Sequence, residues 1–300
     1  MGFENLILIG APTECTGWPG GLGRSPTVLR DLGIVEAVEA STDLNDLPIR
    51  IDTPERDPVS GVIGAASVER AIQRTRDAVE RILNGGSRPL ILGGCCTYVI
   101  GAMAAATHVH GRCGLVYVDG HLDLYDGRTS PTGECADMPM SAMLGKAGDL
   151  FTRAMGLEQA VNPADVALLA YRDYATARTE GSLLPEDFAP EPFHRDADTI
   201  RRTGPERIAQ EALRQQGDGA GRYWLHLDWD VLDPTEFPAV DYLMPGGLSW
   251  DELETLVRPL IASERLIGVS TACYNPDRDP GLSGGRQIVD FLRRVFTPDG

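Results

Sequence analysis

Short apolar runs alternate with longer segments of helical periodicity along this chain of 300 residues. Apolar runs of four to six residues, bounded by Gly, Pro or polar residues, are typical of buried strands. The runs that predict strands are 6–9, 89–92, 113–118, 166–170, 223–228 and 266–269. Apolar residues that recur three or four positions apart predict helices over 68–83, 99–106, 248–261 and 286–296.

Helix-capping and helix-terminating residues support these boundaries. The helix predicted over 68–83 runs into Gly85 and Gly86, which favour a C-terminal stop, and Ser249 is a suitable N-cap for a later helix. Strands that alternate with helices indicate a mostly parallel sheet with helices on both faces. No repeat, low-complexity tract or linker divides the chain, so we expect one α/β domain over 1–300.

Four segments rich in Gly, Pro, Ser, Thr and charge are expected to be loops: 40–60, 125–140, 172–200 and 273–285. Several of them follow predicted strands. In open α/β sheets, the loops at the carboxyl ends of the strands build the functional site.

Two acidic stretches stand directly after predicted strands and about a hundred residues apart. Asp119, His121 and Asp123 alternate in the first, and Asp228 and Asp230 in the second, so each set can point to one side of an extended chain. Four carboxylates in one pocket would repel each other unless a cation balanced them. Carboxylates with an imidazole suit Mn, Fe, Co, Ni or Zn. Two solvated strand ends are the alternative.

These residues resemble the motifs of the arginase/agmatinase, or ureohydrolase, family. Asp-x-His-x-Asp from Asp119 is followed by Asp-x-Asp-x-x-Asp-Pro over 228–234. Further landmarks occur in the family's order: Gly10-Ala-Pro12, Leu92-Gly-Gly-Cys-Cys-Thr97, Pro245-Gly-Gly-Leu-Ser249 and Tyr274-Asn-Pro276. The resemblance runs nearly end to end. It implies a three-layer αβα fold around a mostly parallel sheet of about eight strands, and a trimer or hexamer.

The resemblance also implies two divalent metal ions bridged by a hydroxide. In that scheme Asp119 and Asp228 bridge the two ions, Asp123 binds one ion, and His121 and Asp230 bind the other. The family's usual metal is Mn.

The family's remaining ligand, a histidine, falls on Cys96, and Cys95 takes the place of the Asp before it. A thiolate can bind a divalent metal directly, and compared with imidazole it favours Zn, Fe, Co or Ni over Mn. The alternatives are a buried structural cysteine with an empty first metal position, or ligation by Cys95. A bacterial branch of the family that hydrolyses hydroxyarginine is similar in having cysteine here, so the substitution is compatible with catalysis.

The substrate end departs from the family. Thr132 and Gly133 keep part of its anion-binding loop, but Glu134 replaces an Asn and Ala136 falls on the proton-shuttling His. Cys273 stands where the family has the Glu that grips the guanidinium. These positions make Thr132, Gly133, Glu134 and Cys273 the candidate substrate-binding residues.

Three acids are the candidate catalytic residues: Asp123, Glu134 and Asp137. Glu134 and Asp137 could pair with a cationic substrate or transfer protons, and hydrated loop carboxylates are the alternative. Ala175 falls on the family's acid that binds the α-amino group. His226 shares a strand side with the later acids, so it could lie near the site or in the core.

Composition narrows the partners. The formal net charge of −17 argues against nucleic acid and anionic membrane surfaces, and no apolar run approaches the length of a membrane span. The start at Met1 lacks the pattern of a secretory signal, and the six cysteines show neither paired-zinc spacing nor a disulfide framework. We therefore expect a cytoplasmic protein with reduced thiols.

Together these features predict a dinuclear-metal hydrolase that attacks a guanidino or amidino C–N bond with a metal-bridging hydroxide. The losses at the substrate end favour a modified small molecule, such as an N-hydroxyguanidino compound, over arginine. The alternative is a catalytically altered or inactive metal-binding homologue.

Overall fold

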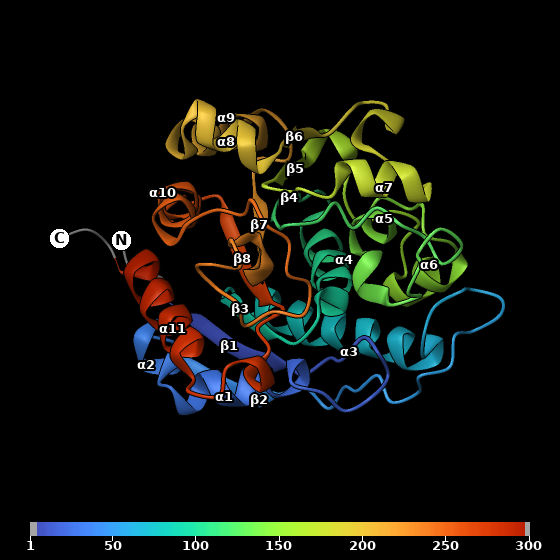
Figure 1. The fold of residues 1–300 in the computed structure, drawn as a ribbon, viewed down its shortest axis with the longest axis horizontal. Coiled ribbons are helices and arrows are strands. Elements are labelled where there is room, and N and C mark those ends of the chain that lie inside the picture. Colours follow the sequence, from blue (N-terminus) through green and yellow to red (C-terminus); the bar gives the residue numbers. More distant parts are fainter. Residues whose placement is uncertain (1–4, 298–300) are drawn as a thin grey trace.

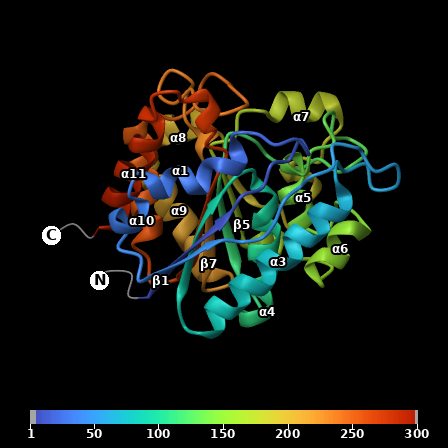
Figure 2. The ribbon, with the colours of Figure 1, turned by 90° about the horizontal axis from the view of Figure 1, so that it is seen from below.

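The structure is a computed structural model that describes residues 5–297. Eight parallel strands form one sheet, and helices cover both of its faces (Figures 1 and 2). Across the sheet the strands are β2 (Thr42–Asp46), β1 (Leu6–Ala11), β3 (Arg88–Gly93), β8 (Leu266–Ala272), β7 (Tyr223–Asp228), β4 (Gly114–Val118), β5 (Val166–Leu169) and β6 (Phe193–Arg195). The predicted three-layer fold is confirmed. The ends of the predicted range 1–300, Met1 included, lie outside the described residues.

Alternation along the strands divides the core into two layers. Leu115 and Trp224 point to one face, and their neighbours Val116 and Leu225 point to the other. The first layer packs under α3 (Ala65–Asn84), α4 (Val99–His110), α5 (Pro139–Met143), α6 (Asp149–Met155) and α7 (Tyr174–Glu180). The second packs under α1 (Ser25–Asp31), α2 (Ile34–Ala37), α8 (Ala197–Thr203), α9 (Pro205–Asp218), α10 (Trp250–Ile261) and α11 (Ser283–Phe296). Among residues 5–297, no helix is both long and apolar enough to cross a bilayer.

The elements with the clearest sequence pattern agree with the structure. Ser249 caps α10 as predicted: its hydroxyl accepts from the Glu252 backbone at 3.2 Å, and the Glu252 carboxylate accepts from the Ser249 backbone at 2.9 Å. This reciprocal pair satisfies two donors that the start of a helix otherwise leaves unpaired.

The four predicted loops are only partly irregular. Segment 40–60 contains β2, segment 125–140 contains a 3-10 turn and the start of α5, and segment 172–200 contains α7, β6 and part of α8. Segment 273–285 contains the 3-10 turn Pro276–Arg278 and the start of α11. The loop predictions were wrong at these elements, which the sequence pattern missed because they are short. In addition, β2 is a largely exposed edge strand without an apolar face.

Candidate metal centre

The candidate ligands stand at the carboxyl edge of neighbouring central strands. Cys96 begins the turn after β3, Asp119 follows β4, Asp228 ends β7, and Cys273 follows β8. Because all the strands are parallel, these four points meet at one edge of the sheet. A cavity of about 580 Å³ opens there, and all six predicted ligands line it: Cys96, Asp119, His121, Asp123, Asp228 and Asp230.

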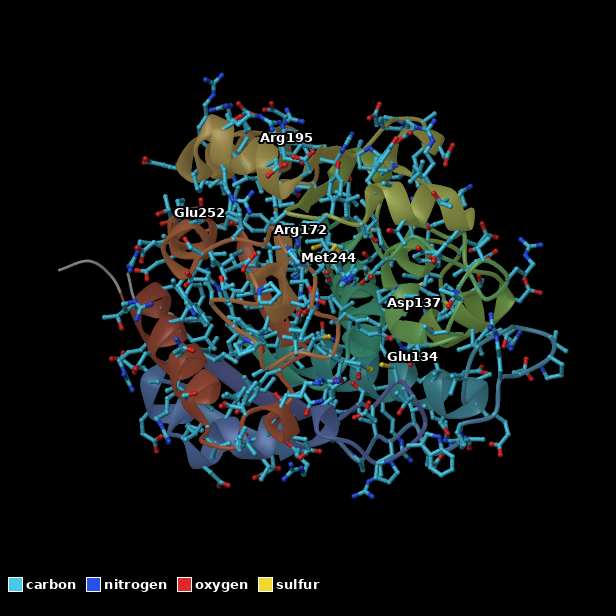
Figure 3. All side chains as sticks on the ribbon, viewed as in Figure 1. Glu134, Asp137, Arg172, Arg195, Met244 and Glu252 are labelled. Atoms are coloured by element: carbon cyan, nitrogen blue, oxygen red, sulfur yellow. The ribbon has the colours of Figure 1, made fainter. Side chains whose placement is uncertain are left out.

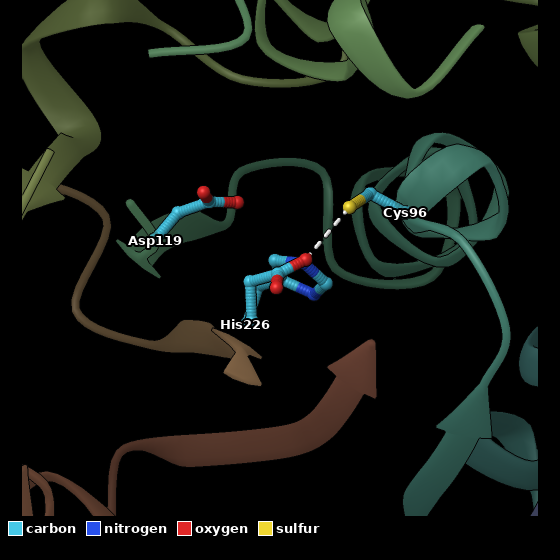
Figure 4. Close-up of side chains that lie close together, drawn as sticks. Cys96, Asp119 and His226 are labelled. Carbon is cyan, nitrogen blue, oxygen red and sulfur yellow. Dashed lines mark hydrogen bonds between the residues drawn. The ribbon is translucent and has the colours of Figure 1, made fainter. Parts of the chain in front are cut away.

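One group of donor atoms surrounds Asp228. The thiol of Cys96 donates to Asp228 Oδ2 at 2.9 Å, and Cys273 Sγ lies 3.5 Å from Cys96 Sγ. Ligand atoms of Cys96, Asp119, His226 and Asp228 all lie within 4.8 Å of one another, and the four residues are buried. Figure 4 shows the side chains of Cys96, Asp119 and His226 converging, with the Cys96 contact dashed.

A second group contains Asp119, His121 and Asp230, whose ligand atoms also lie within 4.8 Å of one another. His121 Nδ1 is 3.1 Å from Asp230 Oδ2 and 3.5 Å from Asp119 Oδ1. Backbone amides hold both carboxylates: the His121 N–H donates to Asp119 at 2.7 Å and the Gly120 N–H to Asp230 at 3.1 Å. Asp119 thus belongs to both groups, which is the position expected of a bridging ligand.

Asp123 stands apart from these two groups, although it lines the same cavity. Its Oδ2 accepts a 2.5 Å hydrogen bond from the buried hydroxyl of Tyr117. Its backbone has a φ of 53°, in the left-handed region that non-glycine residues rarely adopt. The extended alternation predicted from Asp119 to Asp123 therefore breaks at the last residue.

The donor set fits divalent cations. Burial, and to a smaller extent the charge of Asp230, raise the pKa of Asp119 to about 7. Burial and the charges of Asp230 and Asp119 raise the pKa of Asp228 well above its usual range. Asp119 Oδ2 and His226 Nε2 are buried without any hydrogen-bond partner. Buried polar atoms in native proteins are normally paired, so two unpaired atoms among crowded carboxylates fit a site that binds a cation.

Most of the predicted substrate-end residues line the same cavity. Thr132, Glu134, Asp137 and Cys273 do so, and Figure 3 labels Glu134 and Asp137. Glu134 Oε2 accepts from the thiol of Cys15 at 3.2 Å and from the hydroxyl of Tyr242 at 3.3 Å. Asp137 Oδ2 accepts from two hydroxyls of its own loop, at 2.5 and 2.7 Å.

Gly133 serves the loop rather than the cavity wall. Its φ is 79°, and a Cβ at this position would come within 2.8 Å of the Arg56 side chain. Arg56 in turn donates to the carbonyls of Gly127 and Ser130 at 3.0 and 2.8 Å. Gly133 is therefore required for the close approach that holds the loop in place.

The sequence patterns missed several residues of the cavity wall, among them Glu14, Asp241, Tyr242 and Met244. Burial raises the pKa of Glu14 to about 8, and nearby negative groups add to the shift. The position of Glu14, just after β1, is the signal that could have found it, because every loop at the carboxyl edge of a parallel sheet is a candidate.

A sequence profile described as "Arginase family" matches residues 4–296. The chain belongs to the arginase family. An arginase of Bacillus caldovelox is 26% identical in sequence over 299 residues, and the match covers 98% of each chain. The native structure of an arginase from Bacillus caldovelox superposes on this chain with a TM-score of 0.87 and 24% sequence identity. That superposition covers 100% of this chain and 99% of the arginase. A formimidoylglutamase from Bacillus subtilis shares the fold with a TM-score of 0.74 and 19% sequence identity. The superposition covers 99% of this chain and 87% of the formimidoylglutamase.

These matches confirm the resemblance seen in the motifs. Members of the arginase family are metal-dependent amidinohydrolases that act on non-peptide C–N bonds, and the chain is an enzyme of this class.

Proposed function

We propose that this arginase-family enzyme hydrolyses a C–N bond of a modified guanidino or amidino compound, such as an N-hydroxyguanidino compound, at a pair of divalent metal ions. The observation that carries the proposal is the position of the ligand cluster: it lies at the wall of an acidic cavity whose substrate end differs from the family pattern.

The charge of the cavity favours a cationic substrate. Eleven of the lining residues are Asp or Glu. The cationic side chains among the described lining residues are His121 and Arg278, and Arg278 donates to Asp241 at 2.5 Å. Two divalent ions would balance the acids of the ligand cluster, but other acids of the lining would remain, among them Glu134, Asp137 and Glu180. Guanidinium and amidinium groups carry the complementary charge.

Six residues would hold the two ions: Cys96, Asp119, His121, Asp123, Asp228 and Asp230, with Asp119 and Asp228 shared. The family favours Mn, and the sulfur of Cys96 makes Zn, Fe, Co or Ni suitable as well. When bound, such ions supply hydroxide near neutral pH and stabilise negative charge that develops on the attacked carbon's substituents.

Glu134 and Asp137 would carry the protons. In each carboxylate the hydrogen bonds described above fall on one oxygen, Oε2 of Glu134 and Oδ2 of Asp137, so Oε1 and Oδ1 could receive a substrate or water. Burial raises the pKa of both groups above its ordinary value. A carboxyl shifted in this direction holds a proton closer to neutral pH, as a general acid for a departing amine requires.

The substrate end supports a less basic target than arginine. Cys273 lines the cavity where the resemblance implies a guanidinium-binding Glu, Ala136 lines it where a His is implied, and Ala175 is exposed on α7. A guanidinium without its carboxylate loses a charge-assisted hydrogen bond worth about 1.5–3 kcal/mol, roughly ten- to a hundredfold in binding. An N-hydroxyguanidine is less basic and would lose less.

A substrate panel tests this function. The metal-loaded protein is assayed with arginine, agmatine, N-hydroxyarginine, and amidino and formimino compounds, and the released urea, hydroxyurea or ammonia is measured. We expect kcat/KM for the best modified compound to exceed that for arginine and agmatine by at least tenfold, and the Asp228→Asn protein to be inactive on all of them. Equal turnover of arginine or agmatine would contradict the proposed substrate.

A further inference from the structure

His226 is held rigidly beside the candidate metal centre. It lies in β7, two residues before Asp228, and its side chain is fully buried. The imidazole stacks on Tyr117, with ring centroids 4.7 Å apart, and meets the edge of Tyr98 at 6.3 Å. Packing on two sides fixes the plane of the ring, so the direction in which its nitrogens point is set by the fold.

The two ring nitrogens have different surroundings. Nδ1 lies 2.8 Å from Ser270 Oγ on β8, whereas Nε2 is buried and has no hydrogen-bond partner. The same Ser270 oxygen accepts from the indole N–H of Trp224 at 2.9 Å, and the Tyr98 hydroxyl donates to the backbone carbonyl of Thr271 at 2.6 Å. A hydroxyl has one hydrogen and two lone pairs. When that hydrogen points away from the ring, the Nδ1–H group of His226 donates to the remaining lone pair of Ser270 and Nε2 carries no hydrogen.

His226 belongs to a cluster that includes a second residue with an unpaired atom. A ring nitrogen of His226 lies within 4.8 Å of ligand atoms of Cys96, Asp119 and Asp228, and Asp119 Oδ2 is also buried without a partner (Figure 4). A bare imidazole nitrogen and a carboxylate oxygen are both acceptors, so they cannot satisfy each other. A shared cation satisfies both.

We infer that His226 Nε2 binds a metal ion in this centre, together with Cys96, Asp119 and Asp228. This inference rests on the proposed function, because it assigns one further donor to the metal pair. Ser270 is the outer hydrogen-bond partner that fixes the tautomer, as carboxylates, carbonyls and waters do for other metal-binding histidines. One position of the centre thus keeps a neutral imidazole, although Cys96 replaces the histidine that the family resemblance implies.

The assignment changes the division of the ligands. Asp123 is held by Tyr117 and lies outside the group that contains His226. The position beside Cys96 would therefore combine sulfur, nitrogen and two carboxylates, a donor set that suits Zn, Co, Fe or Ni.

The sequence contains five histidines, so the inference can be tested by counting imidazoles on the wild-type chain. The full-length protein is labelled with ¹⁵N-histidine, stripped with a chelator and titrated with Zn²⁺ while the ring nitrogens are followed by NMR. His108, His110 and His194 are assigned by single replacement with Gln. We expect two imidazoles, those of His121 and His226, to change on zinc binding.

If zinc binds and the His121 imidazole alone changes, the inference about His226 is overturned while the proposed function stands. If neither Zn²⁺ nor Mn²⁺ binds to the stripped protein, both are overturned. The His226→Ala protein supplies a second measurement, in which chelator competition should give at least tenfold weaker zinc binding. The matched control is His194→Ala, since that ring contacts Tyr171 and Glu191 at a distance from the centre. Unchanged affinity in a folded His226→Ala protein would also overturn the inference.

Discussion

The thiol of Cys96 lies 2.9 Å from a carboxylate oxygen of Asp228, although 132 positions separate the two residues in the chain. Cys96 follows β3 and Asp228 ends β7, with β8 between these strands in the sheet. Parallel topology brings the carboxyl ends of all three strands to one edge, so a soft sulfur donor enters a cluster of hard carboxylate oxygens. This combination sets the expected metal chemistry.

We expect Cys96→His to keep the metal site and shift its preference towards Mn, because a neutral nitrogen replaces a charged, softer sulfur. The stripped protein is equilibrated with equal concentrations of Mn²⁺ and Zn²⁺, and the bound metals are measured. The bound Mn:Zn ratio should rise at least tenfold. Cys113→Ser is the matched control, since Cys113 is buried next to β4 and away from the cavity wall. An unchanged ratio, with an unchanged spectrum of the cobalt-substituted protein, would exclude Cys96 as a ligand.

Loss of a proton-transfer carboxyl should slow turnover without removing metal. For Glu134→Gln or Asp137→Asn we expect kcat on the best substrate to fall by about 10²-fold or more, the usual contribution of a positioned acid or base. The metal content should remain that of the wild type. Glu158→Gln, at an exposed position, is the control. If both Glu134→Gln and Asp137→Asn turn over substrate at the wild-type rate, neither residue delivers the proton.

Glu14 should make stability depend on pH. Burial raises its pKa from 4.5 to about 8, so between these values the folded chain holds a proton that the unfolded chain releases. The free energy of unfolding therefore falls as pH rises, and the contribution present below pH 4.5 is lost above pH 8.

Glu14→Gln removes this titration but keeps the side-chain shape. Both metal-saturated proteins are unfolded with urea at pH 5 and pH 9. Between these two pH values, the free energy of unfolding of the variant relative to the wild type should rise by on the order of 1–3 kcal/mol, allowing for partial hydration of the carboxyl. Parallel pH curves for the two proteins would mean that Glu14 keeps an ordinary pKa.

The family resemblance predicts a trimer or hexamer. Multi-angle light scattering on the purified protein should give three or six times the chain mass of 32.4 kDa. A single species with the mass of one chain would contradict this prediction.

The sequence could place candidate residues at the sheet edge where strand alternation and parallel topology decide the geometry. Asp119 and Asp228 each follow a largely apolar run, so their place at the sheet edge could be inferred before the fold was known. The pattern could not place Asp123, because a backbone with positive φ interrupts the alternation there. It could not place β2 either, because an exposed edge strand has no buried face to produce an apolar repeat.

His226 illustrates the remaining limit. Alternation puts it on the side of Asp228, but the sequence does not say which ring nitrogen finds a partner. That depends on Ser270 of β8, which lies 44 residues later in the chain. Its hydroxyl forms a hydrogen bond with Nδ1, and Nε2 has no partner. Long-range hydrogen bonds of this kind become visible only when the order of strands in the sheet is known.

The metal content of Asp228→Asn tests the central claim most directly. The substitution keeps the side-chain shape and the oxygen that accepts from the Asp230 backbone at 2.9 Å, but it removes the charge that the two ions would share. Elemental analysis should find two divalent ions per wild-type chain and fewer than 0.5 per Asp228→Asn chain, roughly the loss expected when a shared ligand is removed. Asp277→Asn, at an exposed carboxylate of the same cavity, should keep both ions. Two ions per chain in Asp228→Asn would contradict the account.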